Sequence, residues 1–402
     1  MSISNATIQA LLKDIYPKGL PYDATYTDYP FLALMPRDES FYGDSMKVPL
    51  KYGNNPGRSA AFGTAQSNSA YTKNVAFFVE RAADYAVAKL TNEELEAAEV
   101  DQGAFVRTLQ HEIEGATRAA ITSEAISLAE DGSGVIGQLD ATVTLASPTI
   151  LLRDPETVVR FEVGQKIQLA SSRASTGTLR SGTLTIIAID RNSGVLTVGA
   201  NISTISGATV NDFIVIEGDW QAKPKGFTAW IPDAAPGGSD SFFGVNRSAD
   251  VVRLAGIRDD FSNLPIEEAL VKAMKRVHRE GSNANYAFLN FEKFAELENS
   301  LGSKVQYVDV NSPVGVGFRG IKVNSGKMPV TVLADMTVPS NKLWVAEMGV
   351  WKLASLKKSV RILDQDGNKM LRVSNADQVE IRIGGYKQFI CMKPSGQGNF
   401  VI

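Results

Sequence analysis

Side chains able to carry chemistry are few and scattered. The 402-residue sequence contains one cysteine, Cys391, and two histidines, His111 and His278. A single thiol excludes an intrachain disulfide framework and a thiolate-rich metal site. His111 stands beside Glu112 and Glu114, and His278 follows two cationic residues, so we expect solvated or interface positions for both. The sequence therefore offers few residues from which a Ser–His hydrolase site or a histidine-ligated metal centre could be built.

Two partial sequence motifs are present, but the residues around each of them argue against the binding site that the motif would indicate. Residues 315–320, GVGFRG, match a dinucleotide fingerprint, but that motif must open a helix, and the IKV that follows reads as a strand. Residues 364–368, DQDGN, begin like a calcium loop, but the glycine comes too early and the twelfth position is Asn375. No P-loop, HExxH motif or GxSxG elbow is present. We therefore expect no catalytic residue, no bound metal, no cofactor and no enzymatic activity.

Composition is that of a globular protein with mixed charges. The formal net charge is −3, which argues against a surface that wraps nucleic acid. No apolar run approaches the roughly 18 residues that a membrane span requires. The first residues lack the basic and then apolar pattern of a signal peptide, so we expect neither export nor a membrane.

The rest of the chain is organised around a long helix expected within residues 91–131. Thr91 with Glu94 forms a capping-box signature, and Gly132 is a C-terminal stop. Residues 100–103 are expected to separate a short first helix from a second rod of roughly 45 Å. Its predicted buried face is narrow and suits a flat sheet; it comprises Val106, Leu109, Ile113, Ala116 and Ala120.

The segments around this helix differ in pattern. Residues 1–44 form an arm rich in Tyr, Phe and Pro, with Ile8, Leu11, Leu12 and Ile15 on one helical face before Pro17. Residues 45–90 alternate as two strands around a glycine-rich tip. Residues 135–222 contain short β runs at 142–145, 158–163, 166–169, 183–189, 195–198 and 212–216, which predict a small inserted barrel or sandwich. Residues 223–350 read as α/β, with helices beginning near 265 and 291, and 351–402 read as strands with a turn at 366–367.

This order of parts resembles the major capsid protein of tailed bacteriophages, a fold shared with the herpesvirus capsid floor and with encapsulins. The most similar local stretches are RAADYAVAKLTNEELEAAEVD before the long helix, GFRGIKVNSGKMP, and LWVAEMGVWKLA. The resemblance implies an α+β fold with these units: N-terminal arm 1–44, extended hairpin and its base 45–90, spine helix 91–134, inserted β-barrel 135–222, axial domain 223–350, and peripheral strands 351–402.

The resemblance also implies a function. We expect a shell protein that assembles as hexamers and pentamers into an icosahedral virion head around double-stranded DNA, in the host cytoplasm. Relatives often carry a helical scaffolding segment before the arm, so the expected partners include a separate scaffolding protein, a portal and a decoration protein, besides copies of the chain itself. Expected subunit contacts are Tyr52, Asn54, Arg58 and Phe62 on the hairpin and Tyr29 and Phe31 on the arm. An encapsulin-like cargo compartment, or a binding protein that uses the β domain, remains an alternative.

Overall fold

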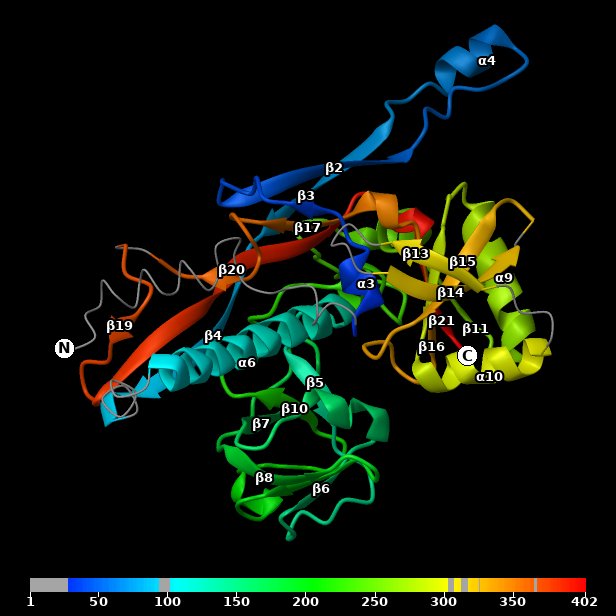
Figure 1. The fold of residues 1–402 in the computed structure, drawn as a ribbon. Helices are drawn as coiled ribbons and strands as arrows, with labels where there is room; N and C mark the ends of the chain where they lie inside the picture. Colours follow the sequence, from blue (N-terminus) through cyan, green and yellow to red (C-terminus); the bar gives the residue numbers. More distant parts are fainter. Residues whose placement is uncertain (1–27, 94–101, 303–306, 312–316, 325, 365–366) are drawn as a thin grey trace.

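The protein is described from a computed structural model covering residues 28–93, 102–302, 307–311, 317–324, 326–364 and 367–402. The fold is α+β, as predicted, with two six-stranded sheets, one seven-stranded sheet and a two-stranded ribbon among these residues. Figure 1 shows the ribbon leaving the body at one side and a small β domain hanging below a long helix. No helix within the described ranges is long and apolar enough to cross a membrane.

The long helix, α6, spans Gln102–Ala129 and lies along strands β4 and β20 (Figure 1). Its predicted apolar face is confirmed at Leu109, Ile113 and Ala120, which are buried in the main core, and at the partly buried Ala116. The short first helix and the side chain of Val106 lie outside what is described. The residues of α6 in the main core are small or aliphatic, which permits the close helix–sheet contact that the sequence predicted, and the charged Glu124 is also buried in this interface.

Strand β20 is the centre of the peripheral sheet. The sheet order is β1-β17-β20-β18, and β4 and β19 also pair with β20. Ile381 and Ile383 of β20 are buried while Arg382 is exposed, so this part of the strand, predicted as β, alternates between core and solvent. The turn predicted at 366–367 falls partly outside the described residues; the described strands on either side of it, β18 and β19, each pair with β20. The strands are β1 Arg37–Asp38, β4 Ala82–Thr91, β17 Trp351–Ser355, β18 Arg361–Ile362, β19 Leu371–Arg372 and β20 Gln378–Cys391.

Residues 135–216 form the second six-stranded sheet, in the order β5-β10-β7-β8-β9-β6. The Asp140 amide donates to Leu151 O at 2.9 Å and the Arg153 amide to Gln138 O at 3.0 Å, which joins the two outer strands and closes a barrel. Its interior is a separate core that is aliphatic except for Phe161. The elements are β5 Val135–Gln138, β6 Thr149–Leu151, η1 Pro155–Arg160, β7 Lys166–Ala170, β8 Leu184–Asp190, β9 Val195–Val198, η2 Ile202–Thr204 and β10 Phe213–Ile216.

Two of the predicted β runs in this barrel are wrong. Residues 158–163 overlap the 3₁₀ helix η1, because Pro155 sets its first turn and Asp154 accepts the Glu156 amide at 3.2 Å. Residues 142–145 form turns, because Asp140 Oδ1 accepts the Thr142 amide at 2.8 Å. In both places a local cap overrides the β propensity of the valines and threonines that prompted the prediction.

The axial domain is built on a seven-stranded mixed sheet in the order β11-β21-β16-β12-β15-β14-β13. Helix α9 begins where the sequence predicts a helix and buries Ile266, Leu270, Met274 and Val277, and Gly317 opens strand β14 rather than a helix. The strands are β11 Ile257–Asp260, β12 Tyr286–Leu289, β13 Tyr307–Asn311, β14 Gly317–Asn324, β15 Pro329–Ala334, β16 Lys342–Ala346 and β21 Gly398–Val401. The helices are α7 Phe227–Trp230, η3 Arg247–Asp250, α8 Val251–Ala255, α9 Ile266–Arg279, α10 Phe291–Leu301, η5 Met348–Val350 and η6 Pro394–Gly396.

The C-terminal boundary differs from the predicted one. Strand β21 lies between β11 and β16 of the axial sheet, so the segment 351–402 divides between two sheets. Phe400 of this strand is fully buried in the axial core and stacks on Phe261 at 5.4 Å between ring centroids. Burial of this ring stabilises β21 in the axial sheet.

Candidate functional site

A ribbon of strands β2 Ser45–Gly53 and β3 Lys73–Glu80 projects from the body of the molecule (Figure 1). The two strands pair antiparallel with each other and with no other described strand. Residues 54–72 form the tip, and its short helix α4 Phe62–Ser67 buries none of its residues (Figure 1). A two-stranded ribbon is marginal by itself, so the base must hold it.

The base of the ribbon is fixed by aromatic packing. Phe77 is fully buried, with its ring 5.1 Å from Trp230 and 6.2 Å from Phe242, both edge-on. The Phe78 amide donates to Phe243 O at 3.0 Å. Trp230 in turn donates through Nε1 to Phe389 O of β20 at 2.9 Å. The ribbon is therefore anchored to the peripheral sheet, and the tip extends from a rigid support.

The four predicted contact residues of the ribbon lie near the end of β2 and in the tip. Tyr52 is half-buried and its carbonyl accepts Arg253 Nη1 at 2.6 Å, while Asn54 and Arg58 are exposed. Phe62 is 83% exposed. The sequence prediction missed Tyr71, which is 94% exposed near Phe62 in sequence and on the same tip. Two large aromatic side chains held in water at the end of a projection are the form expected of a binding element.

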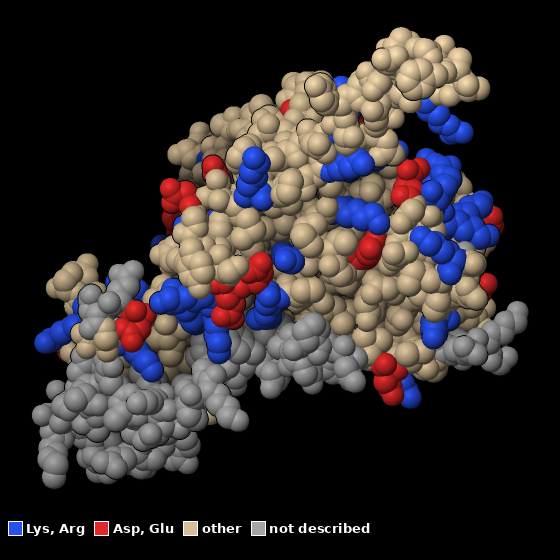
Figure 2. Space-filling model, turned by 90° about the horizontal axis from the view of Figure 1, so that it is seen from above, with Lys and Arg blue, Asp and Glu red and all other residues tan. Residues whose placement is uncertain are grey.

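The tip is also nearly uncharged. Arg58 is the single charged residue in the sequence of residues 54–72. Figure 2 shows acidic and basic side chains interspersed over the body, whereas the projecting tip is mostly free of them. Asn55 Oδ1 shapes the tip by accepting the Gly57 amide at 2.8 Å and the Ala70 amide at 3.2 Å. An apolar contact from this tip would therefore involve little charge desolvation.

The two predicted contact residues of the arm, Tyr29 and Phe31, are buried rather than exposed. Phe31, in helix α3 Pro30–Ala33, is 1% exposed and lies 4.6 Å from the ring of Phe288. Its amide donates to Asp335 Oδ2 at 2.8 Å. Tyr29 is 6% exposed and its hydroxyl donates to Thr122 Oγ1 of α6 at 3.1 Å. Both side chains therefore pack within their own subunit and are not exposed at its surface.

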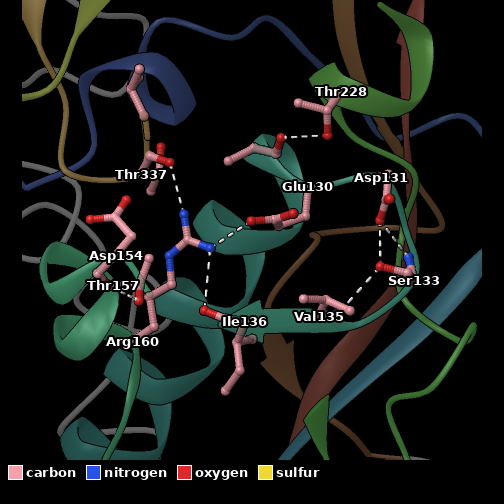
Figure 3. A network of polar contacts seen from close by, with 12 residues as sticks. Glu130, Asp131, Ser133, Val135, Ile136, Asp154, Thr157, Arg160, Thr228 and Thr337 are labelled. Carbon is pink, nitrogen blue, oxygen red and sulfur yellow. Dashed lines mark hydrogen bonds and ion pairs between the residues drawn. The ribbon is translucent and has the colours of Figure 1, made fainter. Parts of the chain in front are cut away.

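A buried ion network attaches the barrel to α6 and the axial domain (Figure 3). Arg160 Nη1 donates to Glu130 Oε1 at 2.5 Å, just beyond the end of α6, and Nη2 donates to Thr337 O at 3.0 Å. Arg173 of the barrel pairs with the other oxygen of Glu130. Burial alone would raise the pKa of Glu130, but Arg173 and Arg160 outweigh it and hold the pKa below its ordinary value.

A second network joins α6 to the peripheral sheet. Lys387 of β20 is 1% exposed and lies 2.7 Å from Glu124 Oε2 and 3.5 Å from Asp84 Oδ2. Lys223 lies 2.7 Å from Asp84 Oδ1 and 3.2 Å from Asp219 Oδ2. Burial opposes the ionised form of Asp84, yet the two lysines leave its pKa lowered. Sequence reasoning missed all these pairs. Apart from Lys223 and Asp219, which are four positions apart, their members lie 30 (Arg160 and Glu130) to 303 (Lys387 and Asp84, 387 − 84) positions apart, and no local pattern marks them.

The residues first considered for chemistry do not converge. Cys391 is fully buried, which raises the pKa of its thiol. His111 is exposed on α6, as predicted, but His278 is only 8% exposed, which corrects the expected solvated position. Its Nε2 lies 3.3 Å from Ala284 O. Within the described ranges no three His, Cys, Asp or Glu side chains gather as a metal site.

Comparisons with known proteins agree with this geometry at the level of the fold. No family model and no curated protein sequence matches the chain. The capsid asymmetric unit of Cyanophage A-1(L) matches with a TM-score of 0.55 and 12% identity, over 90% of this chain and 89% of that one. The holo-SrpI encapsulin complex from Synechococcus elongatus matches with a TM-score of 0.48 and 8% identity, over 96% and 90%. The native GTA capsid matches with a TM-score of 0.43 and 10% identity, over 96% and 92%.

The chain has the tailed-phage major capsid fold. The likeness to the cyanophage capsid establishes that fold. Fold alone does not define function, so the functional conclusion depends on the ribbon and the surfaces described above.

Proposed function

We propose that this protein is the major capsid protein of a tailed phage, and that copies of it form a closed shell. The observation that carries the proposal is the anchored ribbon, whose tip presents Phe62 and Tyr71 to water while its base is fixed by Phe77. A monomer gains nothing from holding two aromatic side chains there. A neighbouring copy that covered them would bury apolar surface and stabilise the contact.

The proposed contact is heterologous, because the ribbon of one copy would bind a different surface of the next. Contacts of this kind close into rings when the rotation permits, which would give hexamers and pentamers and, from them, an icosahedral head. Tyr52, Asn54, Arg58 and Phe62 are the proposed contact residues. Many weak contacts of this kind would together make a stable shell.

The proposed interior is double-stranded DNA held without sequence recognition. The net charge of −3 and the interspersed charges in Figure 2 suit a wall that does not bind phosphate strongly. The proposed partners are a separate scaffolding protein, a portal and a decoration protein, and assembly would take place in the host cytoplasm.

The test is expression of the full chain, alone and with a scaffold candidate from the same genome, followed by negative-stain microscopy. Uniform shells or ring-shaped capsomers support the proposal. A species that stays monomeric at every concentration, with and without scaffold, contradicts it.

A matched pair of variants locates the contact. Phe62→Ser removes an exposed aromatic at the tip, and Phe291→Ser removes one that is 56% exposed on the axial helix α10. We expect the first to abolish shells and the second to leave them intact. Nuclease-protected DNA inside shells assembled in infected cells separates a virion head from an encapsulin-like compartment, which would hold protein cargo.

A further inference from the structure

One lysine ammonium group and two carboxyl groups meet where the chain leaving the barrel passes strand β4. Lys223 Nζ lies 2.7 Å from Asp84 Oδ1 of β4 and 3.2 Å from Asp219 Oδ2. It also donates to Ser123 Oγ of α6 at 2.9 Å. The side chains of Lys223 and Asp84 are 14% and 6% exposed. This geometry holds an amine against a carboxyl group in surroundings that are mostly shielded from water.

The two oxygens of Asp84 have different neighbours. Oδ1 faces Lys223, whereas Oδ2 is buried without a hydrogen-bond partner among the described residues and lies 3.5 Å from Lys387 Nζ. Lys387 is itself held by Glu124 Oε2 at 2.7 Å. A cation fixed beside Oδ2 would stabilise the negative charge that develops on this oxygen when a nucleophile adds to the carboxyl carbon.

Asp219 is the neighbouring group that can move a proton. Burial raises the pKa of Asp219, so this carboxyl group accepts a proton more readily than an exposed aspartate does. Burial opposes the charged form of Lys223, but Asp84 and Asp219 outweigh it and leave the pKa of Lys223 raised, while the pKa of Asp84 is lowered. Lys223 and Asp84 therefore rest as ions, and the free amine forms when Asp219 takes its proton.

We propose that Lys223 and Asp84 form an amide bond with each other after the chain has folded. Asp219 takes a proton from the Lys223 ammonium group, and the free amine adds to Cγ of Asp84 while Lys387 stabilises the charge on Oδ2. Oδ1 then leaves as water, with one proton from the attacking nitrogen and one returned by Asp219. An ammonium and a carboxylate become an amide and one water, and no other reactant is needed.

The bond would tie the exit of the barrel to the peripheral sheet. The two residues are 139 positions apart, and the loop between them contains α6 and the whole barrel. The reaction removes two buried charges and leaves Lys387 paired with Glu124. A cross-link across so long a loop restricts the unfolded chain, so the linked subunit should resist unfolding more than the unlinked one. This inference does not rest on the proposed shell function, because the bond forms within one copy.

The test is the mass of the purified full chain, measured after denaturation and again after digestion with trypsin. We expect the intact chain to be lighter than its sequence by one water molecule. Trypsin should release residues 82–89 joined to residues 192–225. The pair of Lys342 and Asp233 is the matched control: its atoms are also 2.7 Å apart, but the Asp233 side chain is 62% exposed, so these two residues should stay in separate, unlinked peptides.

Two variants assign the roles of the amine and the proton carrier. Lys223→Met lacks the nucleophile and should have the full mass of its sequence. Asp219→Asn keeps the shape of the side chain but cannot carry the proton, so the bond should form about a hundredfold more slowly after cell-free synthesis. A loss of bond formation in Asp219→Asn without loss of folding, measured by circular dichroism, separates proton transfer from a merely structural role.

Four results overturn the proposal. A wild-type chain with the full mass of its sequence means that the pair stays ionic. A water deficit located at Asp131 and Gly132 indicates a succinimide there instead. A branched peptide that contains Lys387 assigns the bond to the other lysine, and a doubled mass assigns it to two copies. Each result is read on denatured chains, so it stays separate from success or failure of shell assembly.

Discussion

Lys387 Nζ lies 2.7 Å from Glu124 Oε2 in the interface between β20 and α6, and these side chains are 1% and 0% exposed. Glu124 Oε1 also accepts Ser359 Oγ at 3.3 Å. The pair fixes the position of the long helix on the sheet. Such buried pairs add little stability over an apolar pair, but removing Glu124 leaves the buried Lys387 with Asp84 alone, at 3.5 Å, and so undercompensates its charge.

Breaking this pair should therefore destabilise the subunit strongly. We expect Glu124→Ala to cost about 3–5 kcal/mol, whereas the double variant Glu124→Leu with Lys387→Met should recover much of that loss. Glu112→Ala, on the exposed face of the same helix, should change stability by less than about 0.5 kcal/mol. Urea unfolding followed by tryptophan fluorescence measures all three. A Glu124→Ala midpoint equal to wild type would refute this role.

The Glu130 network should lose its contribution in acid. The two arginines hold the folded-state pKa of Glu130 below the ordinary 4.5. A depressed carboxyl pKa stabilises the fold above the unfolded pKa, and this stability disappears as pH falls from about 4.5 through the lower folded value. We expect the stability gap between wild type and Glu130→Gln to be widest near neutral pH and to close in acid. A gap that is constant across a pH series of thermal melts would count against the network.

The two ends of the ribbon should respond differently to substitution. Phe77→Ala empties a fully buried site beside Trp230 and should cost about 3–5 kcal/mol. Phe62→Ser changes an exposed side chain and should leave the unfolding midpoint within about 0.5 kcal/mol of wild type while assembly is lost. Thermal melts paired with particle counts by microscopy separate the two effects. Loss of stability in Phe62→Ser would mean that the tip packs on its own subunit.

The junction of the barrel with the body requires glycine at 134. Gly134 has φ +79, and a Cβ there would lie 2.2 Å from Asp219 O. Gly164 has φ +89 but no atom within 4 Å of an added Cβ. Gly164→Ala should therefore lower the free energy of unfolding by only about 1 kcal/mol, the cost of a positive φ for alanine. Gly134→Ala should lower it by clearly more, because the added Cβ also clashes. Differential scanning calorimetry of the two variants makes the comparison, and equal melting temperatures would show that the close approach is not rigid.

The elements with strong periodicity were predictable from sequence. The faces of α6 and α9 and the alternation in β20 follow directly from their apolar spacing, and the ribbon from its two alternating runs. Residues 158–163 were not predictable in the same way, because Pro155 and the Asp154 cap override valine propensity there. The sheet to which β21 belongs could not be predicted from sequence, since its short apolar pattern around Phe400 fits either sheet equally well.

The positions of the proposed contact residues were predictable only in part. The lack of strand pattern predicts the tip and places Arg58 and Phe62 in it, and the same argument would have added Tyr71; their contact with another copy stays a prediction. Tyr29 and Phe31 were misplaced because sequence shows that an aromatic residue must be buried, but not in which copy. The buried ion pairs leave no local trace, since Lys387 meets Glu124 across 263 positions.

The most direct measurement of the central claim is the mass distribution of the purified full chain, taken by light scattering and negative-stain microscopy across a concentration series with a scaffold candidate. The account predicts capsomers and closed shells for wild type and Phe291→Ser, and small soluble species for Phe62→Ser. A wild-type chain that stays monomeric throughout, with Phe62 shielded from solvent in that monomer, would contradict it.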